Sequence, residues 1–466
     1  MQLVVLVMLL LIPFCSWAGP ADSVLIDEVL LIGHKKTRPR VIFREMTFGR
    51  GQLIARDELP LEVSRSYNNL MNTGLFASIE MSYDTAGAEA GRTVVIVNMR
   101  ETWYLYPVPE FELADRNFNV WWNEQDRSLD RVNIGGKLTH YNFTGQRDRL
   151  RLGFTTGYTR SMEASYGFPY VNKAGSIGIN FGFGYQRRRE QNYLTRNNRQ
   201  EFYSDPDNWV YRRSSAQISV SYRRRIYLSH NVSFGWQQST ISDTISNYLN
   251  PEFYGNGRGR QRYFRISYDL SNDRRDVRNY PWNGTLLRVG MSKDGLGIYG
   301  ERDGLEVHAD YQKFIPFWKH YSFNYAIAGK YSLIRTRQPF LENRAIGFGS
   351  NGIIGYQFYV VDGLDMMIWK VGLRRELFKT KLDLGKLVFI DAFRYVPIRL
   401  AASIQFNQGF ANAPFVDDSN RLNNSLLTGF GAGLDFILYY DMVGGVQYNR
   451  NHLGEDGVYL NFNMSF

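Results

Sequence analysis

Apolar and polar residues alternate without interruption over the last eleven residues of the chain, Asp456–Phe466. The apolar members are Val458, Leu460, Phe462, Met464 and Phe466, and between them lie Tyr459, Asn461, Asn463 and Ser465. Successive side chains of a strand point to opposite faces, so this pattern predicts a strand with one apolar and one wet face. The closing strand of a membrane barrel and an ordinary half-buried edge strand fit this segment equally well.

The same period-two pattern recurs along residues 103–466. Leu305, Val307, Ala309 and Tyr311, for example, alternate with Glu306, His308, Asp310 and Gln312. Sixteen segments are expected as strands, with approximate spans 104–114, 131–142, 146–158, 160–170, 174–188, 211–226, 228–242, 260–271, 283–294, 303–315, 319–335, 364–378, 398–409, 426–438, 442–450 and 457–466.

The connections between these segments alternate in length. Asn142–Gln146 and Pro316–Lys319 are short, whereas Glu190–Val210 and Thr336–Gly363 are long. Short turns at one end and long loops at the other are typical of transmembrane β-barrels. Beyond the N-terminus no apolar run reaches about 18 residues, so membrane-crossing helices are not expected. We therefore predict a 16-stranded antiparallel transmembrane β-barrel over residues 103–466, with a secreted soluble β protein as the alternative.

Residues 22–101 follow a different pattern and predict a separate α+β domain. The expected order is β-α-α-β-β, at Val24–Ile32, Arg38–Met46, Pro60–Asn72, Leu75–Tyr83 and Arg92–Arg100. Leu61, Leu70 and Met71 share one side of the second expected helix, which gives it an apolar face. The Ala/Gly/Glu-rich segment Thr85–Gly91 is expected as the turn between the last two strands.

Residues 1–18 predict a secretory signal peptide. Leu3–Ile12 is an apolar run, and Ser16 and Ala18 place small residues before a cleavage point at Gly19. Cys15 is the only cysteine, so the mature chain is expected to contain none. That excludes disulfides and thiolate metal sites in the mature protein.

Positive charge is concentrated in two arginine triplets, Arg187–Arg189 and Arg223–Arg225, in a chain of net charge +10. Basic clusters occur on nucleic-acid-binding surfaces. Both triplets, however, lie at the ends of expected strands, where arginine side chains can reach lipid headgroups or lipopolysaccharide phosphates. We therefore expect contact with outer-membrane lipids and no nucleic-acid partner.

The sequence contains no combination of residues that predicts an enzyme. The six histidines, His34, His140, His308 and His452 among them, are scattered without the spacing of metal ligands. A Gly-x-Ser-x-Gly nucleophile motif is also absent from the sequence. We expect no catalytic residue, no cofactor and no metal.

Several motifs within residues 22–101 resemble a POTRA domain. The most informative are Val41–Glu45, which contains Arg44 and Glu45, and Asn72-Thr73-Gly74-Leu75-Phe76. The candidate POTRA residues are therefore Arg44, Glu45, Gly74, Leu75 and Phe76. The resemblance implies a periplasmic domain whose sheet edge receives extended polypeptides by β-augmentation.

A single POTRA domain followed by a 16-strand barrel resembles the BamA/TamA superfamily of outer-membrane assembly and translocation proteins. Asp273–Asp276 and Pro281–Gly284 match the turn between strands eight and nine of that superfamily. The resemblance implies a place in the outer membrane of a Gram-negative-type bacterium, with the POTRA domain in the periplasm. The implied partners are unfolded outer-membrane or secreted polypeptides and periplasmic or lipoprotein accessory subunits.

The resemblance also places a diagnostic motif in the sixth outer loop, which folds back into the lumen in the superfamily. The matching residues here are Gly349, Ser350, Asn351, Ile354, Gly355 and Tyr356. Ile354 stands where the superfamily has an arginine, and Asn407 stands where its acidic partner on strand thirteen is expected; Asp391 is an alternative match. We expect the loop to be held by packing and neutral hydrogen bonds in place of an ion pair.

A gate between the first and last strands is the third feature that the resemblance implies. Pro107 and Pro109 lie in the first expected strand, where each removes a hydrogen-bond donor. Phe462 and Phe466 lie in the last strand and are expected to close the barrel. The two prolines fit a domain linker equally well. A second function also stays open, because a pore or lipid conduit could retain the fold without inserting proteins.

Overall fold

The computed structural model describes residues 22–169, 171–172, 174–383, 385, 395–438 and 442–463. The chain separates into two compact units, one ending at Thr102 and one beginning at Trp103. The predicted signal peptide, Phe466 and Asp391 lie outside the described residues. Each unit is described in turn below.

The first unit is a four-stranded mixed sheet with helices. Its sheet has the order β2-β1-β4-β3, in which β1 and β4 run parallel. The elements are β1 (Ser23–Ile32), α2 (Pro39–Glu45), β2 (Leu53–Ala55), α3 (Leu59–Met71), β3 (Phe76–Tyr83), α4 (Thr85–Glu89) and β4 (Arg92–Glu101). The predicted α+β class is confirmed.

The predicted order β-α-α-β-β omitted two elements of this unit. β2 spans only Leu53–Ala55, and three residues are too few to show a period of two. α4 occupies Thr85–Glu89, inside the segment predicted as a plain turn. The two central strands carry the core: Val24 and Ile26 of β1 and Val95 and Val97 of β4 are fully buried.

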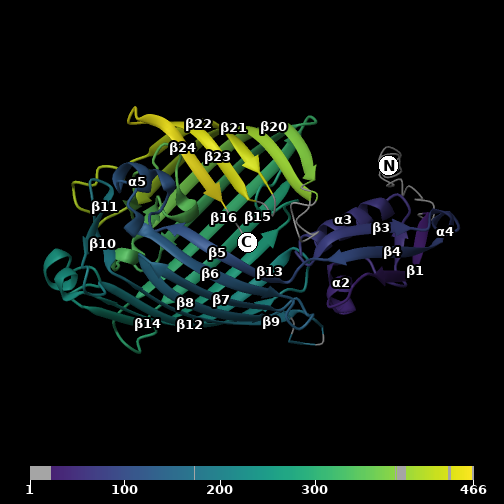
Figure 1. The fold of residues 1–466 in the computed structure, drawn as a ribbon, viewed down its shortest axis with the longest axis horizontal. Coiled ribbons are helices and arrows are strands. Elements are labelled where there is room, and N and C mark those ends of the chain that lie inside the picture. Colours follow the sequence, from purple (N-terminus) through teal and green to yellow (C-terminus); the bar gives the residue numbers. More distant parts are fainter. Residues whose placement is uncertain are drawn as a thin grey trace, which may run out of the picture. The chain divides into compact units, whose positions relative to one another are not determined.

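The second unit is an antiparallel sheet of 16 strands that curls into a barrel (Figure 1). Every strand pairs with the next one in this order, and all sixteen predicted strands are present. They are β5 (Leu105–Leu113), β6 (Val132–Tyr141), β7 (Arg149–Gly157), β8 (Thr159–Phe168), β9 (Ile177–Arg188), β12 (Tyr211–Tyr222), β13 (Leu228–Ile241), β14 (Arg260–Asp273), β15 (Gly284–Asp294), β16 (Gly304–Phe317), β17 (Tyr321–Ser332), β20 (Asp365–Asp383), β21 (Tyr395–Asn412), β22 (Leu427–Ile437), β23 (Val443–Asn451) and β24 (Asp456–Asn463).

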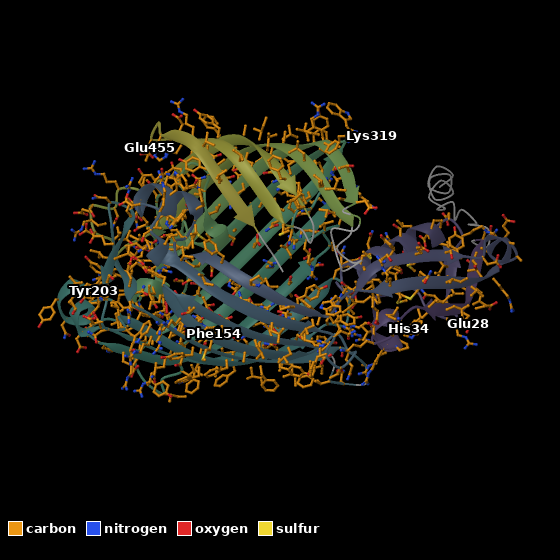
Figure 2. The ribbon with its side chains drawn as sticks, in the orientation of Figure 1. Glu28, His34, Phe154, Tyr203, Lys319 and Glu455 are labelled. Carbon is orange, nitrogen blue, oxygen red and sulfur yellow. The ribbon has the colours of Figure 1, made fainter. Side chains whose placement is uncertain are left out.

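The wall of the barrel is apolar outside and polar or small inside. Phe154, Phe183 and Ile404 are 52%, 55% and 62% exposed on the outer face, as lipid-facing residues are in the absence of lipid. Many aromatic rings project outward from the wall, with Phe154 of β7 among the labelled side chains (Figure 2). The lumen face of β22 instead carries Gly429, Gly431 and Gly433, as the alternation predicts.

The long loops contain secondary structure that the sequence pattern did not reveal. These elements are α5 (Phe118–Glu124), the hairpin β10 (Glu190–Arg196) and β11 (Arg199–Ser204), a π-helical turn Ile245–Leu249, and the pair β18 (Arg344–Ile346) and β19 (Val361–Asp362), with short 3₁₀ turns at Leu129–Arg131, Phe340–Glu342 and Gly349–Asn351. Within the described ranges, helices long and apolar enough to cross a membrane are not found.

Candidate functional site: loop six and the barrel seam

Loop six, the connection 333–364 between β17 and β20, is packed against the inner wall of the barrel. Ile346, Ile353 and Tyr356 of the loop are at most 3% exposed. They form one apolar cluster with residues of the wall, which include Ile368 of β20 and Ala411 of β21. A loop with a buried apolar face of this kind is a fixed plug rather than a solvated surface loop.

Cationic side chains hold the backbone of loop six. Each donates to loop carbonyl oxygens, which accept charge-assisted hydrogen bonds that are stronger than neutral ones. The bonds run from Lys330 Nζ to Arg344 O (2.7 Å) and Gly363 O (3.1 Å), from Lys370 Nζ to Ser350 O (3.0 Å), and from Arg116 Nη1 to Tyr359 O (2.9 Å). Packing on the wall therefore acts together with these charge-assisted hydrogen bonds to hold the loop.

Arg116 and Asp362 are among the ionisable groups in these outer segments whose pKa values are shifted by burial. Burial lowers the pKa of Arg116 to about 10, so it remains charged at neutral pH. Burial also raises the pKa of Asp362, in the loop-six strand β19, to about 6. Asp362 therefore loses its charge in mildly acidic conditions, which removes the cost of burying a carboxylate in the plug.

The predicted motif residues of loop six contact strands β21 to β23. The carbonyl oxygen of Ile354 lies against Gly429 of β22, and Gly429 is the cross-strand partner of Asn407 in β21. Asn407 faces the lumen and is only 3% exposed. Ile354 of loop six and Asn407 of the wall, the two positions predicted to replace the superfamily's charged pair, therefore lie near each other.

The end of the motif is fixed by side chains of the last strands. Gly355 has a φ of +81°, a conformation that favours glycine, and its carbonyl oxygen accepts from Asn451 Nδ2 at 2.8 Å. Tyr356 donates its hydroxyl toward Thr428 O at 3.3 Å and also contacts His452. At the start of the motif, Gly349, Ser350 and Asn351 form the 3₁₀ turn that presents Ser350 O to Lys370.

Substituting Gly429 by alanine should displace loop six. A Cβ at this position would lie 1.9 Å from Ile354 O, and overpacking of this kind typically costs about 1–3 kcal/mol. Gly182, on the lumen face of β9, has no atom within 4 Å of the corresponding Cβ, so Gly182→Ala is the matched control. We expect faster proteolysis of loop six and a lower barrel melting temperature for Gly429→Ala only. Equal behaviour of the two variants would show that the contact does not position the loop.

The seam lies between β5 and β24, the two ends of the 16-strand order. Within the described residues no ladder joins these two strands, whereas each has a continuous register with its other neighbour. The amide of Ala114 donates to Arg131 O at 2.8 Å, and the amide of Tyr141 donates to Tyr104 O at 2.8 Å. The backbone N–H and C=O groups of the even-numbered residues of β5 therefore point toward β6, and those of the odd-numbered residues point toward the seam. This follows because hydrogen bonding alternates along an antiparallel strand.

Pro107 and Pro109 have odd numbers, so their nitrogens face the seam. Proline has no N–H to donate, and it is confined to free edges or bulges for this reason. Both prolines thus remove donors from the open edge and leave the ladder between β5 and β6 intact. On the opposite side, the backbone of Phe462 belongs to β24, and Phe466 lies beyond the described residues.

The helix α5, in the loop between β5 and β6, connects the seam with loop six. Asn119 of this helix donates to Leu460 O at 3.4 Å and accepts from Leu460 N at 3.3 Å, so its amide satisfies part of the free edge of β24. Asn117 caps the helix by accepting from Val120 N (2.9 Å) and donates to Gln357 O of loop six (2.8 Å). The N-cap asparagine is the one sequence signal that could have predicted α5.

Buried asparagines join three outer loops above the lumen. Asn198, at the tip of the β10–β11 hairpin, is 2% exposed and has a φ of +57°. It contacts loop six and the loop between β21 and β22 through hydrogen bonds of Asn198 Nδ2 to Asn423 Oδ1 (2.7 Å), Asn198 N to Asn420 Oδ1 (2.7 Å), Val360 N to Asn198 O (2.8 Å) and Asn423 Nδ2 to Asp362 O (2.7 Å). Asn-Asn at a hairpin turn is a recognisable sequence signal, but the sequence does not reveal the hydrogen-bond partners of these asparagines.

The turn between β14 and β15 folds inward at the opposite end of the barrel. Tyr280 and Trp282 are at most 9% exposed and pack with Ala401 of β21. Tyr280 donates to Asp435 Oδ2 at 2.8 Å, and the guanidinium of Arg399 lies 4.2 Å from the centre of the Trp282 ring. The turn between β14 and β15 therefore holds β21 and β22 through contacts across the lumen. These contacts require the particular residues Tyr280 and Trp282 in the turn.

The predicted POTRA residues have structural places in the first unit. Gly74 has a φ of +72° three residues after α3 ends, and Leu75 and Phe76 are buried where β3 begins. Glu45 is buried at the end of α2, and Arg44 beside it is half-buried. The Asn72–Phe76 motif thus ends a helix and starts a strand, and its apolar residues belong to the core.

The described part of the chain contains no group of three or more His, Cys, Asp or Glu residues positioned to hold a metal ion. Its charged side chains instead form ion pairs and cation–ring contacts that involve arginine and lysine. Arg131, for example, binds Asp115 and Glu190 and lies 4.8 Å from the ring centre of Phe202. These contacts hold loops in place.

Comparisons with known proteins agree with this geometry. Residues 142–363 match the family model described as Omp85 superfamily domain. BamA from Haemophilus ducreyi lacking POTRA domains 1-3 superposes with a TM-score of 0.53 at 13% identity, covering 94% of this chain and 84% of that one. CdiB from Escherichia coli gives a TM-score of 0.56 at 11% identity, covering 94% and 75%. At the sequence level no curated protein matches.

Proposed function

We propose that this chain, whose residues 142–363 match the Omp85 superfamily domain, is an outer-membrane β-barrel protein that assists the insertion or translocation of polypeptides at the outer membrane. The seam between β5 and β24 is its gate. The observation that carries this proposal is that, within the described residues, no ladder joins β5 to β24, whereas every other neighbouring pair of strands in the sheet has one.

Separating β5 from β24 costs little free energy. A backbone hydrogen bond contributes about 0.5–1.5 kcal/mol net, and breaking a full ladder would cost several of these at once. The β20–β21 ladder runs from Asp365 to Asp383 with one irregularity between Glu376 and Phe378, whereas the described edge of β24 is bridged to α5 by the amide of Asn119. With Pro107 and Pro109 on the facing edge, a client strand that pairs with β24 displaces few existing bonds.

The client reaches the barrel through the first unit in this proposal. β3 is an end strand of the sheet order, so its outer edge is available for β-augmentation by an extended segment. Main-chain hydrogen bonds would supply affinity with little dependence on sequence. Such an edge suits a receptor for many unfolded clients.

Loop six and the gate are mechanically linked through the segment Arg116–Asn119. Arg116 and Asn117 hold loop-six carbonyl oxygens, and Asn119 holds the edge of β24. A client that takes the place of Asn119 on β24 removes one of the attachments of α5. The plug is then held by fewer contacts, so gate opening and release of loop six occur together.

Reconstitution distinguishes this function from the alternative. We expect liposomes that contain the full chain to accelerate folding of an unfolded test barrel relative to empty liposomes. The replacement of the superfamily arginine by Ile354 favours the second candidate, a pore or lipid conduit without insertase activity. That candidate predicts no acceleration, together with leakage of an entrapped solute. Acceleration without leakage supports insertion, and leakage without acceleration contradicts it.

A further inference from the structure

Arginines form a row on the lipid-facing wall at the long-loop end of the barrel. Arg160 of β8 is the cross-strand partner of Arg187 in β9, and Arg187 is in turn the partner of Arg212 in β12. The row continues through Thr240 of β13 to Arg260 of β14. Five adjacent strands thus present four arginines at one level.

These arginines share the outer face with apolar residues of the membrane band. Side chains two residues apart lie on one face of a strand. Arg160 therefore lies on the same face as Met162, which is 57% exposed, and Arg187 on the same face as Phe183. The row lies where β9 and β13 end and where β8, β12 and β14 begin, at the end of the long loops. That end faces the cell exterior in outer-membrane barrels.

The charge of the row is largely uncompensated. Within the part of the chain that the structure describes, Arg160, Arg187, Arg212 and Arg260 make no ion pair with a carboxylate. Three guanidinium groups instead lie over the ring of Trp209. Their distances from the ring centre are 4.2 Å for Arg187, 5.1 Å for Arg160 and 5.2 Å for Arg189. Stacking of this kind orders the guanidinium groups while leaving their N–H donors free for an anion.

We propose that this row binds the phosphate groups of a phosphorylated glycolipid in the outer leaflet. Guanidinium groups pair with phosphate through parallel hydrogen bonds. Neighbouring strands lie about 4.8 Å apart, so four strand intervals extend the row over roughly 19 Å. One phosphate would occupy only part of that length, whereas a sugar headgroup carrying several phosphates matches it. The proposal does not depend on the gate or on insertase activity.

Lipid binding to the purified full chain tests the proposal. Native mass spectrometry or a thermal-shift titration would compare a diphosphorylated lipid A, the same lipid after phosphatase treatment, and phosphatidylglycerol. We expect binding of the diphosphorylated lipid to exceed that of the other two. The double variant Arg160→Gln/Arg187→Gln should weaken it roughly tenfold or more, because two charge-assisted contacts are lost.

The chain offers a control with the same change of charge. Arg224→Gln/Arg225→Gln neutralises two exposed arginines in the short turn after β12, at the opposite end of the barrel. This variant should bind the lipid like the wild type. Equal losses in both variants, or phosphatidylglycerol binding as tightly as lipid A, would overturn the proposal. If the first double variant fails to fold, the double variant Arg212→Gln/Arg260→Gln, which removes the other two arginines of the row, takes its place with the same expected loss.

Discussion

A disulfide that joins β5 to β24 should abolish insertion of a test barrel, and reduction of that disulfide should restore it. The proposed gate must separate these strands from each other to admit a client strand, and a covalent link prevents this. Cysteine pairs would combine one residue from Tyr106–Phe111 with one from Val458–Asn461. The expected rate of test-barrel folding in the oxidised state is that of empty liposomes.

A second disulfide, placed within a paired part of the sheet, controls for effects of cross-linking itself. Ser267 of β14 and Ser292 of β15 are direct cross-strand partners, and serine-to-cysteine changes alter little volume. The oxidised Ser267→Cys/Ser292→Cys protein should insert clients at the wild-type rate. If the seam-locked protein also works at that rate, the β5–β24 gate is not used, and the conduit function gains support.

The strands of the barrel could be predicted from the sequence because lipid and lumen impose opposite demands on alternate residues. Leu305, Val307 and Ala309 face outward along β16, while Glu306 and His308 face the lumen, as the alternation predicts. Only the ends differ. The predicted span 398–409 is part of the longer strand β21, Tyr395–Asn412, because pairing with β20 continues past the residues that alternate clearly.

The contacts that hold the candidate site together could not be predicted in this way. Lys370 and Ser350 lie on a strand and in a loop, and nothing local in the sequence identifies a backbone carbonyl as the partner of the lysine. The hydrogen bonds of Asn198 with Asn420 and Asn423 likewise join segments more than 200 residues apart, with |i−j| of 222 and 225. Periodicity reports which face a residue occupies and carries no information on its long-range partner.

The helix α5 illustrates a third reason for a missed prediction. Phe118–Glu124 is a single short helix with no apolar period long enough to recognise, and isolated helices of this length are unstable in water. Its stability comes from tertiary contacts, which include the bonds of Asn117 to Gln357 and of Asn119 to Leu460. The proposed gate therefore depends on an element that forms only in the folded barrel.

Replacing Arg131 by methionine should destabilise the barrel more than any other single substitution considered for this chain. Arg131 is 6% exposed, and its side chain binds Asp115 (Nη2 to Oδ1, 2.8 Å) and Glu190. The side chain of Asp115 is only 1% exposed. Methionine would remove the cation that contacts the buried carboxylate of Asp115 and the largely buried one of Glu190, and breaking a buried pair in this way costs about 3–5 kcal/mol.

The unfolding midpoint of the purified barrel in guanidinium measures this effect, with Arg196→Met as the matched control. Arg196 pairs with Glu201 at 3.3 Å, and their side chains are 57% and 31% exposed, so its loss should cost about 0–1 kcal/mol. Adding Asp115→Asn and Glu190→Gln to Arg131→Met should recover a large part of the lost stability, because it removes the two unpaired charges. The triple variant could also be no more stable than Arg131→Met. In that case the destabilisation comes from lost packing against Phe202 and Tyr158 and does not come from the loss of the ion pairs.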